Sequence, residues 1–100
     1  MKDLSERTKC LALDIIHLYY KLPKTTVAQV LGKQLLRSGT SVGAHYHEGT
    51  RARSDAEFIS KLEGGLQELA ESDYWLDLLE RAHVLKPEEA QPRRTEIDEL

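Results

Sequence analysis

The stretch SDAEFISKLEGGLQELAESDYWLDLLERAH, residues 54–83, decides the fold of this 100-residue chain. Apolar or small residues recur in it every three or four positions without interruption, which is typical of a helix face that packs against other helices. Ser54 and Glu57 form a capping-box signal at its start, so we expect a helix over about residues 54–84. The residues in register are Phe58, Leu62, Gly65, Leu69, Ser72, Leu76, Leu79 and His83.

Two further helices are expected on the N-terminal side of this segment. Residues 4–22 repeat the same spacing, and Pro23 ends it because proline lacks a backbone donor and disfavours helix in the residue before it. Residues 26–49 open with a second capping-box signal, Thr26 and Gln29, and keep the apolar register to their end.

The middle of this second helix, SGTSVGA at residues 38–44, is poor in helix formers, so a loop is the rival interpretation. Gly39 and Gly43 lie four residues apart and would share one helix face, where a neighbouring helix can approach closely. The apolar register also continues across the stretch. We therefore favour a continuous helix.

A short fourth helix is expected at about residues 87–99. Pro87 suits the first helical position, and the two glutamates after it favour the positive end of the helix dipole. Pro92 leaves open a restart of the helix further on. Because no segment alternates like a strand and no repeat is present, the sequence predicts one all-α domain over residues 1–100, an antiparallel up-down-up-down four-helix bundle with short loops.

Composition places the chain among ordinary soluble globular proteins. It is 40% hydrophobic and 31% charged, and its one cysteine, Cys10, excludes an internal disulfide or a zinc finger built on several cysteines. No apolar run approaches the ~20 residues that span a bilayer. We therefore expect a cytoplasmic protein without a membrane partner.

Charge is distributed unevenly along the chain. The net charge is −3, but residues 1–50 carry seven Lys/Arg against four Asp/Glu, whereas residues 51–100 carry seven against thirteen. The overall acidity counts against a general nucleic-acid binder without excluding a local basic patch.

The junction between the second and third predicted helices resembles a known bacterial family. The stretch SVGAHYHE at residues 41–48 is followed by Arg51-Ala52-Arg53-Ser54, Glu57-Phe58-Ile59, Lys61-Leu62 and Tyr74-Trp75-Leu76. Together these segments resemble the small four-helix-bundle proteins encoded by intervening sequences (IVS) in bacterial large-subunit ribosomal RNA genes. The resemblance covers about residues 4–85.

This resemblance implies a bacterial, non-enzymatic protein that assembles as a homopentameric ring. The similar accessory variability determinant proteins of diversity-generating retroelements form such pentamers, bind a reverse transcriptase and contact nucleic acid. By the same resemblance, RNA, DNA or a reverse transcriptase would be the partner of this chain. Two departures stand out: His45 replaces the Asn that is usual in the family, and the fourth helix stops early.

The second half of the 54–84 helix is apolar on two sides, which predicts a contact beyond one bundle. Trp75, Leu78 and Ala82 lie away from the main core arc, and the extra apolar face consists of Tyr74, Trp75 and Leu78. Either the fourth helix or the C-terminal tail covers them, or they form a self-association interface, where Tyr and Trp are enriched. We expect self-association, and the resemblance sets the number of subunits at five.

Four basic residues are concentrated around the second helix and the connector that follows it. They suit contact with an anion or a nucleic-acid phosphate, and a ring would repeat them by symmetry. The alternative is a set of solvated charges that pair with Glu48 and Glu57. The four residues are Lys33, Arg37, Arg51 and Arg53.

A metal-dependent enzyme is the alternative function. Asp14 with His17, and Glu80 with His83, each place an acid and a histidine at the i, i+3 spacing of di-metal bundles. A complete site needs two more inward carboxylates, and the second helix offers Glu48 at the opposite end of the bundle. We therefore expect no metal, no cofactor and no enzymatic activity.

Overall fold

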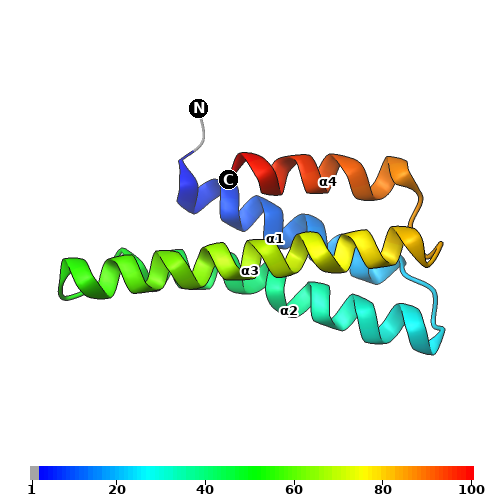
Figure 1. The fold of residues 1–100 in the computed structure, drawn as a ribbon, viewed down its shortest axis with the longest axis horizontal. Coiled ribbons are helices and arrows are strands. Elements are labelled where there is room, and N and C mark those ends of the chain that lie inside the picture. Colours follow the sequence, from blue (N-terminus) through cyan, green and yellow to red (C-terminus); the bar gives the residue numbers. More distant parts are fainter. Residues whose placement is uncertain (1–2) are drawn as a thin grey trace.

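The computed structural model describes residues 3–100, which form four α-helices and no strand (Figure 1). The helices run alternately in opposite directions, so the predicted all-α, up-down-up-down four-helix bundle is confirmed. The predicted helix ends differ from the observed ones by at most three residues. The observed helices are α1 (Leu4–Lys21), α2 (Thr26–Gly49), α3 (Asp55–Arg81) and α4 (Pro87–Glu99).

Side-chain caps begin the first three helices. Ser54 Oγ accepts a hydrogen bond from the Glu57 amide at 3.1 Å, as the sequence signal predicts. At the start of α2 the cap is Thr25 rather than Thr26, because Thr25 Oγ1 accepts from the Ala28 amide at 3.3 Å. Gln29 is therefore free for another role, and its side chain accepts a 2.8 Å hydrogen bond from the Tyr19 hydroxyl.

The small residues in the middle of α2 fit between its two neighbours, and the helix is continuous there as predicted. A Cβ at Gly39 would collide with Ile15 of α1, and a Cβ at Gly43 would lie 3.2 Å from Thr8 Oγ1. On the other side of α2, Ser38 is fully buried against α3. The intrinsic weakness of this stretch as a helix is offset by the close approach of α1 and α3.

Helix α4 is joined to the bundle by ion pairs. Arg94 Nε donates to Asp73 Oδ1 at 2.7 Å, and Arg94 Nη1 lies 3.3 Å from Asp77 Oδ1. Arg93 Nη2 donates to Asp14 of α1 at 3.0 Å. The helix continues through Pro92, so the restart that the sequence left open does not occur.

The four helices differ in length, which leaves one end of the bundle incompletely covered. Helix α4 has 13 residues and α3 has 27, and α4 ends beside the middle of α3 (Figure 1). The α2–α3 hairpin therefore extends past the last residues of α4. No helix in the described range 3–100 is long and apolar enough to cross a membrane.

Candidate interaction surfaces

A row of apolar side chains crosses the outer face of α3, and we call it the α3 ridge. Its members are spaced by four residues, which places them along one slanted line on the helix surface. Leu66 and Tyr74 are 60% and 55% exposed. The α3 ridge consists of Leu62, Leu66, Ala70, Tyr74 and Leu78.

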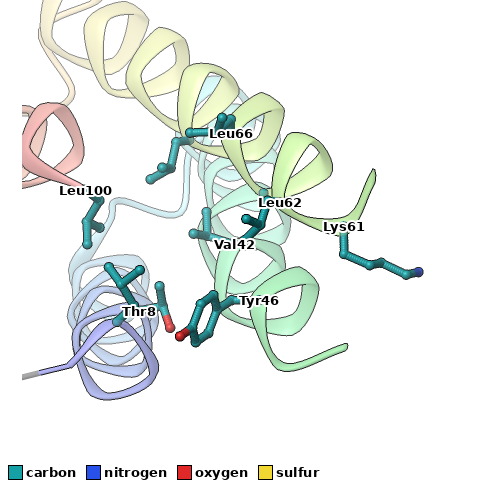
Figure 2. A pocket seen from close by; sticks show the side chains of 10 residues that line it. Thr8, Val42, Tyr46, Lys61, Leu62, Leu66 and Leu100 are labelled. Carbon is teal, nitrogen blue, oxygen red and sulfur yellow. The ribbon is translucent and has the colours of Figure 1, made fainter. Parts of the chain in front are cut away.

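The α3 ridge begins at an apolar cavity of about 210 Å³ that lies where α4 ends (Figure 2). Thr8 of α1, Val42 and Tyr46 of α2, and Leu100 at the end of α4 line it together with the first two ridge residues. Lys61 extends away from the cavity (Figure 2). The uncovered end of the α2–α3 hairpin therefore presents both the apolar cavity and the start of the α3 ridge.

Two of the three predicted interface residues belong to the α3 ridge, and the third packs inward. Trp75 is half-buried against the core, and its ring meets the Tyr74 ring edge-on at a centroid distance of 5.1 Å. Trp75 follows Ser72 by one helical turn, on the side of α3 that contacts α2. Tyr74 and Leu78 are thus the more accessible members of the predicted set.

A second exposed apolar surface lies on α1, and we call it the α1 face. It consists of Ala12, Leu13, Ile16 and Tyr20, of which Leu13 and Tyr20 are 53% and 73% exposed. Leu13 and Tyr20 lie opposite the stripe that α1 buries in the core, whereas Ala12 and Ile16 are half-buried and lie between that stripe and the exposed side.

The structure divides the predicted basic patch into two groups. Arg37, on α2, lies 3.3 Å from Glu68 Oε2 and 2.5 Å from Glu71 Oε1 of α3, so its charge is compensated. Arg51 and Arg53 lie beyond the end of α2 at Gly49, which is itself about 18 Å along the helix axis from Arg37 at 1.5 Å per residue. Lys33 is one helical turn before Arg37 and is exposed.

Arg51 and Arg53 are exposed at the tip of the α2–α3 hairpin. Neither guanidinium forms an ion pair with any residue that the structure describes. Glu48 instead lies 3.7 Å from Lys61, and the Glu57 carboxylate accepts from the Arg53 backbone amide at 3.4 Å. The two acids considered as partners for the arginine side chains are therefore engaged elsewhere.

The residues of the alternative metal site are not assembled into one. Asp14 binds Arg93, and Glu80 Oε1 accepts a 2.8 Å hydrogen bond from Gln91. His17 is exposed on α1, and His83 is exposed just after α3 with a φ of 62°. Within residues 3–100, no three His, Cys, Asp or Glu side chains lie close enough together to hold a metal ion.

His45, the family departure, packs between α2 and α3. A Cβ at Gly64 would lie 2.8 Å from the His45 ring, so the glycine makes room for the imidazole. The buried Nδ1 of His45 has no hydrogen-bond partner among the described residues. The side chain thus acts as a packing group at this helix contact.

Comparison with known proteins places the chain in a family. A search of curated proteins finds no match. The crystal structure of a protein with unknown function from the S23 ribosomal protein family of Bacteroides thetaiotaomicron matches with a TM-score of 0.91 and 36% sequence identity, over 97% of this chain and 90% of that chain. The family model for the 23S rRNA-intervening sequence protein matches residues 3–100. The resemblance seen at the helix junction is confirmed, and the chain belongs to the 23S rRNA intervening sequence protein family.

Proposed function

We propose that this protein is a non-enzymatic, homo-oligomeric interaction module that contacts nucleic acid through Arg51 and Arg53. The observation that carries the proposal is the exposure of large apolar side chains on two helices. They are Leu66 and Tyr74 of the α3 ridge, and Leu13 and Tyr20 of the α1 face. Contiguous apolar surface of this kind marks interaction sites in soluble proteins. The family resemblance supports five subunits.

The engagement of the acidic side chains favours this function over a metal-dependent enzyme. Asp14 and Glu80 each already bond a side chain of α4. A metal would have to replace these contacts and recruit further ligands from other helices. The same contacts instead join α4 to the bundle.

The two arginines at the hairpin tip support a nucleic-acid contact. Each copy contributes two exposed guanidinium groups, which suit phosphate oxygens because they donate bidentate hydrogen bonds. A ring would present the pair once per subunit, and the repeated weak contacts would act together. Avidity would thus compensate for the net negative charge of the chain.

Multi-angle light scattering at micromolar concentration tests the assembly. We expect a particle of five chains for the wild-type protein. Tyr74→Glu should dissociate it, because the new charge would be buried at the interface, whereas circular dichroism should show unchanged helicity because Tyr74 is largely exposed within one chain. Thr95→Glu is the matched control, since it adds the same charge at an exposed position of α4. A monomeric wild-type protein would overturn the proposal.

A further inference from the structure

We infer that the copies associate head to tail, with the α3 ridge of one copy docked on the α1 face of the next. This inference rests on the proposed self-association and adds the identity of the two surfaces. The two surfaces lie on different helices of one chain. When one copy docks on another in this way, the pair still has one free α3 ridge and one free α1 face. Such a heterologous contact continues until it closes into a ring or extends as a filament.

The two surfaces have matching geometry. The α3 ridge follows a row of residues four apart, and the α1 face contains a similar row formed by Ala12, Ile16 and Tyr20. Two helices pack well when rows of this type interdigitate, with their axes about 50° apart. At such a crossing, Ala70 in the middle of the α3 ridge would allow a large side chain of the α1 face to enter between Leu66 and Tyr74.

Charge distinguishes the heterologous contact from a symmetric one. Lys9 is exposed one turn before Ala12 on α1, and Glu63 is exposed one turn before Leu66 on α3. Neither has an ion-pair partner within residues 3–100. When α1 of one copy and α3 of the next cross in the same direction, Lys9 and Glu63 lie at the same end of the contact. Pairing one of each brings opposite charges together, which favours this partner over its alternatives.

A complementation experiment tests the inference directly. Leu66→Glu disables the α3 ridge and Tyr20→Glu disables the α1 face, and both side chains are more than half exposed within one chain, so the fold should persist. We expect each variant alone to be monomeric by light scattering. Mixed in equal amounts they should form a 1:1 heterodimer, because only one intact pair of surfaces then remains. Circular dichroism of each variant checks the fold.

A charge exchange gives a second test that does not depend on apolar positions. Lys9→Glu and Glu63→Lys should each raise the dissociation constant about two- to fivefold, as expected for an exposed ion pair. The double variant should recover the wild-type value, because the pair is restored with its signs reversed. Thr95→Glu, at an exposed position of α4 that belongs to neither surface, serves as the control.

The outcomes separate this inference from the proposed function. A monomeric wild-type protein would remove both. An oligomeric wild-type protein whose Tyr20→Glu variant stays fully assembled would leave self-association standing and overturn the docking of α1. A mixture of the two glutamate variants that remains monomeric would show that the contact is not head to tail. Additive effects of Lys9→Glu and Glu63→Lys on the dissociation constant would show that these two residues do not pair across the contact.

Discussion

The hydroxyls of Ser38 and Ser72 lie 2.8 Å apart at the centre of the contact between α2 and α3, and both side chains are fully buried. The Ser72 hydroxyl also donates to the Glu68 carbonyl at 2.9 Å, so each oxygen has a partner. Two small side chains at this point let the helix backbones approach closely. The hydrogen bond compensates for burying the two polar groups.

Replacing one serine of this pair with alanine should lower the free energy of unfolding more than the loss of a single oxygen atom from the packing would. Ser72→Ala removes the 2.8 Å hydrogen bond between the two hydroxyls and leaves the Ser38 hydroxyl with its longer, 3.3 Å bond to the Leu35 carbonyl, so it should lower the free energy of unfolding by about 1 kcal/mol. The double variant Ser38→Ala, Ser72→Ala should lose less than the sum of the two single variants, because each single variant already loses the hydrogen bond that the two hydroxyls share. Urea unfolding of all four proteins measures the coupling, expected at about 0.5 kcal/mol or more. Additive losses would contradict the prediction.

His45 and Gly64 should show coupled effects on stability. Gly64→Ala should destabilise the protein by about 1–2 kcal/mol, because the added Cβ would lie 2.8 Å from the His45 ring and overpack the contact. In a His45→Ala background the same change should be neutral or stabilising, because alanine is then the better helix former by about 1 kcal/mol. Thermal unfolding of the wild-type protein, the two single variants and the double variant provides the comparison. Equal effects of Gly64→Ala in both backgrounds would rule out the steric explanation.

Arg94 should be the strongest ionic contact between α4 and the rest of the bundle. Its guanidinium bonds two carboxylates of α3, Asp73 and Asp77, so Arg94→Ala should lower stability by about 1–2 kcal/mol after allowing for its partial exposure. Amide hydrogen exchange should accelerate first in α4. Arg81→Ala is the control, because Arg81 binds Asp77 from an exposed position and should contribute only about 0.3–0.5 kcal/mol.

The stability that Arg94 contributes to the fold should not change as the pH rises above neutral. The Asp73 carboxylate, which accepts hydrogen bonds from Arg94, raises the pKa of this guanidinium above its ordinary value. A pKa raised by folding adds stability that is present below the unfolded-state pKa and lost only above it. The difference in unfolding free energy between wild type and Arg94→Ala should therefore stay constant from about pH 6 to pH 10. A difference that shrinks over this range would contradict the assignment.

Nucleic-acid binding should depend on the hairpin tip. The double variant Arg51→Ala, Arg53→Ala should abolish a mobility shift that the wild-type oligomer gives with RNA or DNA at low salt, and binding should be insensitive to sequence and weaken steeply as salt rises. Lys33→Ala with Arg37→Ala should have a smaller effect, because Glu68 and Glu71 already compensate Arg37.

A matched control for this experiment lies at the opposite end of the bundle. Lys24→Ala with Lys86→Ala removes two exposed charges from the other loops and should leave binding unchanged. The absence of any shift at tens of micromolar oligomer, or a shift that survives loss of both tip arginines, would favour a protein partner instead.

The sequence by itself determined the helices, because the signals that define them are local. The spacing of three and four residues over 54–83 identifies α3, the Ser54 cap lies next to its start, and Gly39 with Gly43 marks the face of α2 that another helix approaches. The family resemblance was carried by short motifs at one junction, which can likewise be read without knowing the fold. At Pro92 the sequence left the continuity of the fourth helix open, and the structure shows α4 continuing through it, with ion pairs of Arg93 and Arg94 directly after the proline.

Only the tertiary structure decided which surfaces remain open. Arg37 and Glu71 are 34 residues apart, so their ion pair, and with it the division of the basic residues into two groups, depends on how α2 and α3 align. The end of α4 beside the middle of α3 leaves Leu66 uncovered, whereas the corresponding face further along α3 binds Arg94. Periodicity shows which residues share a helix face, but long-range packing decides whether another helix covers that face.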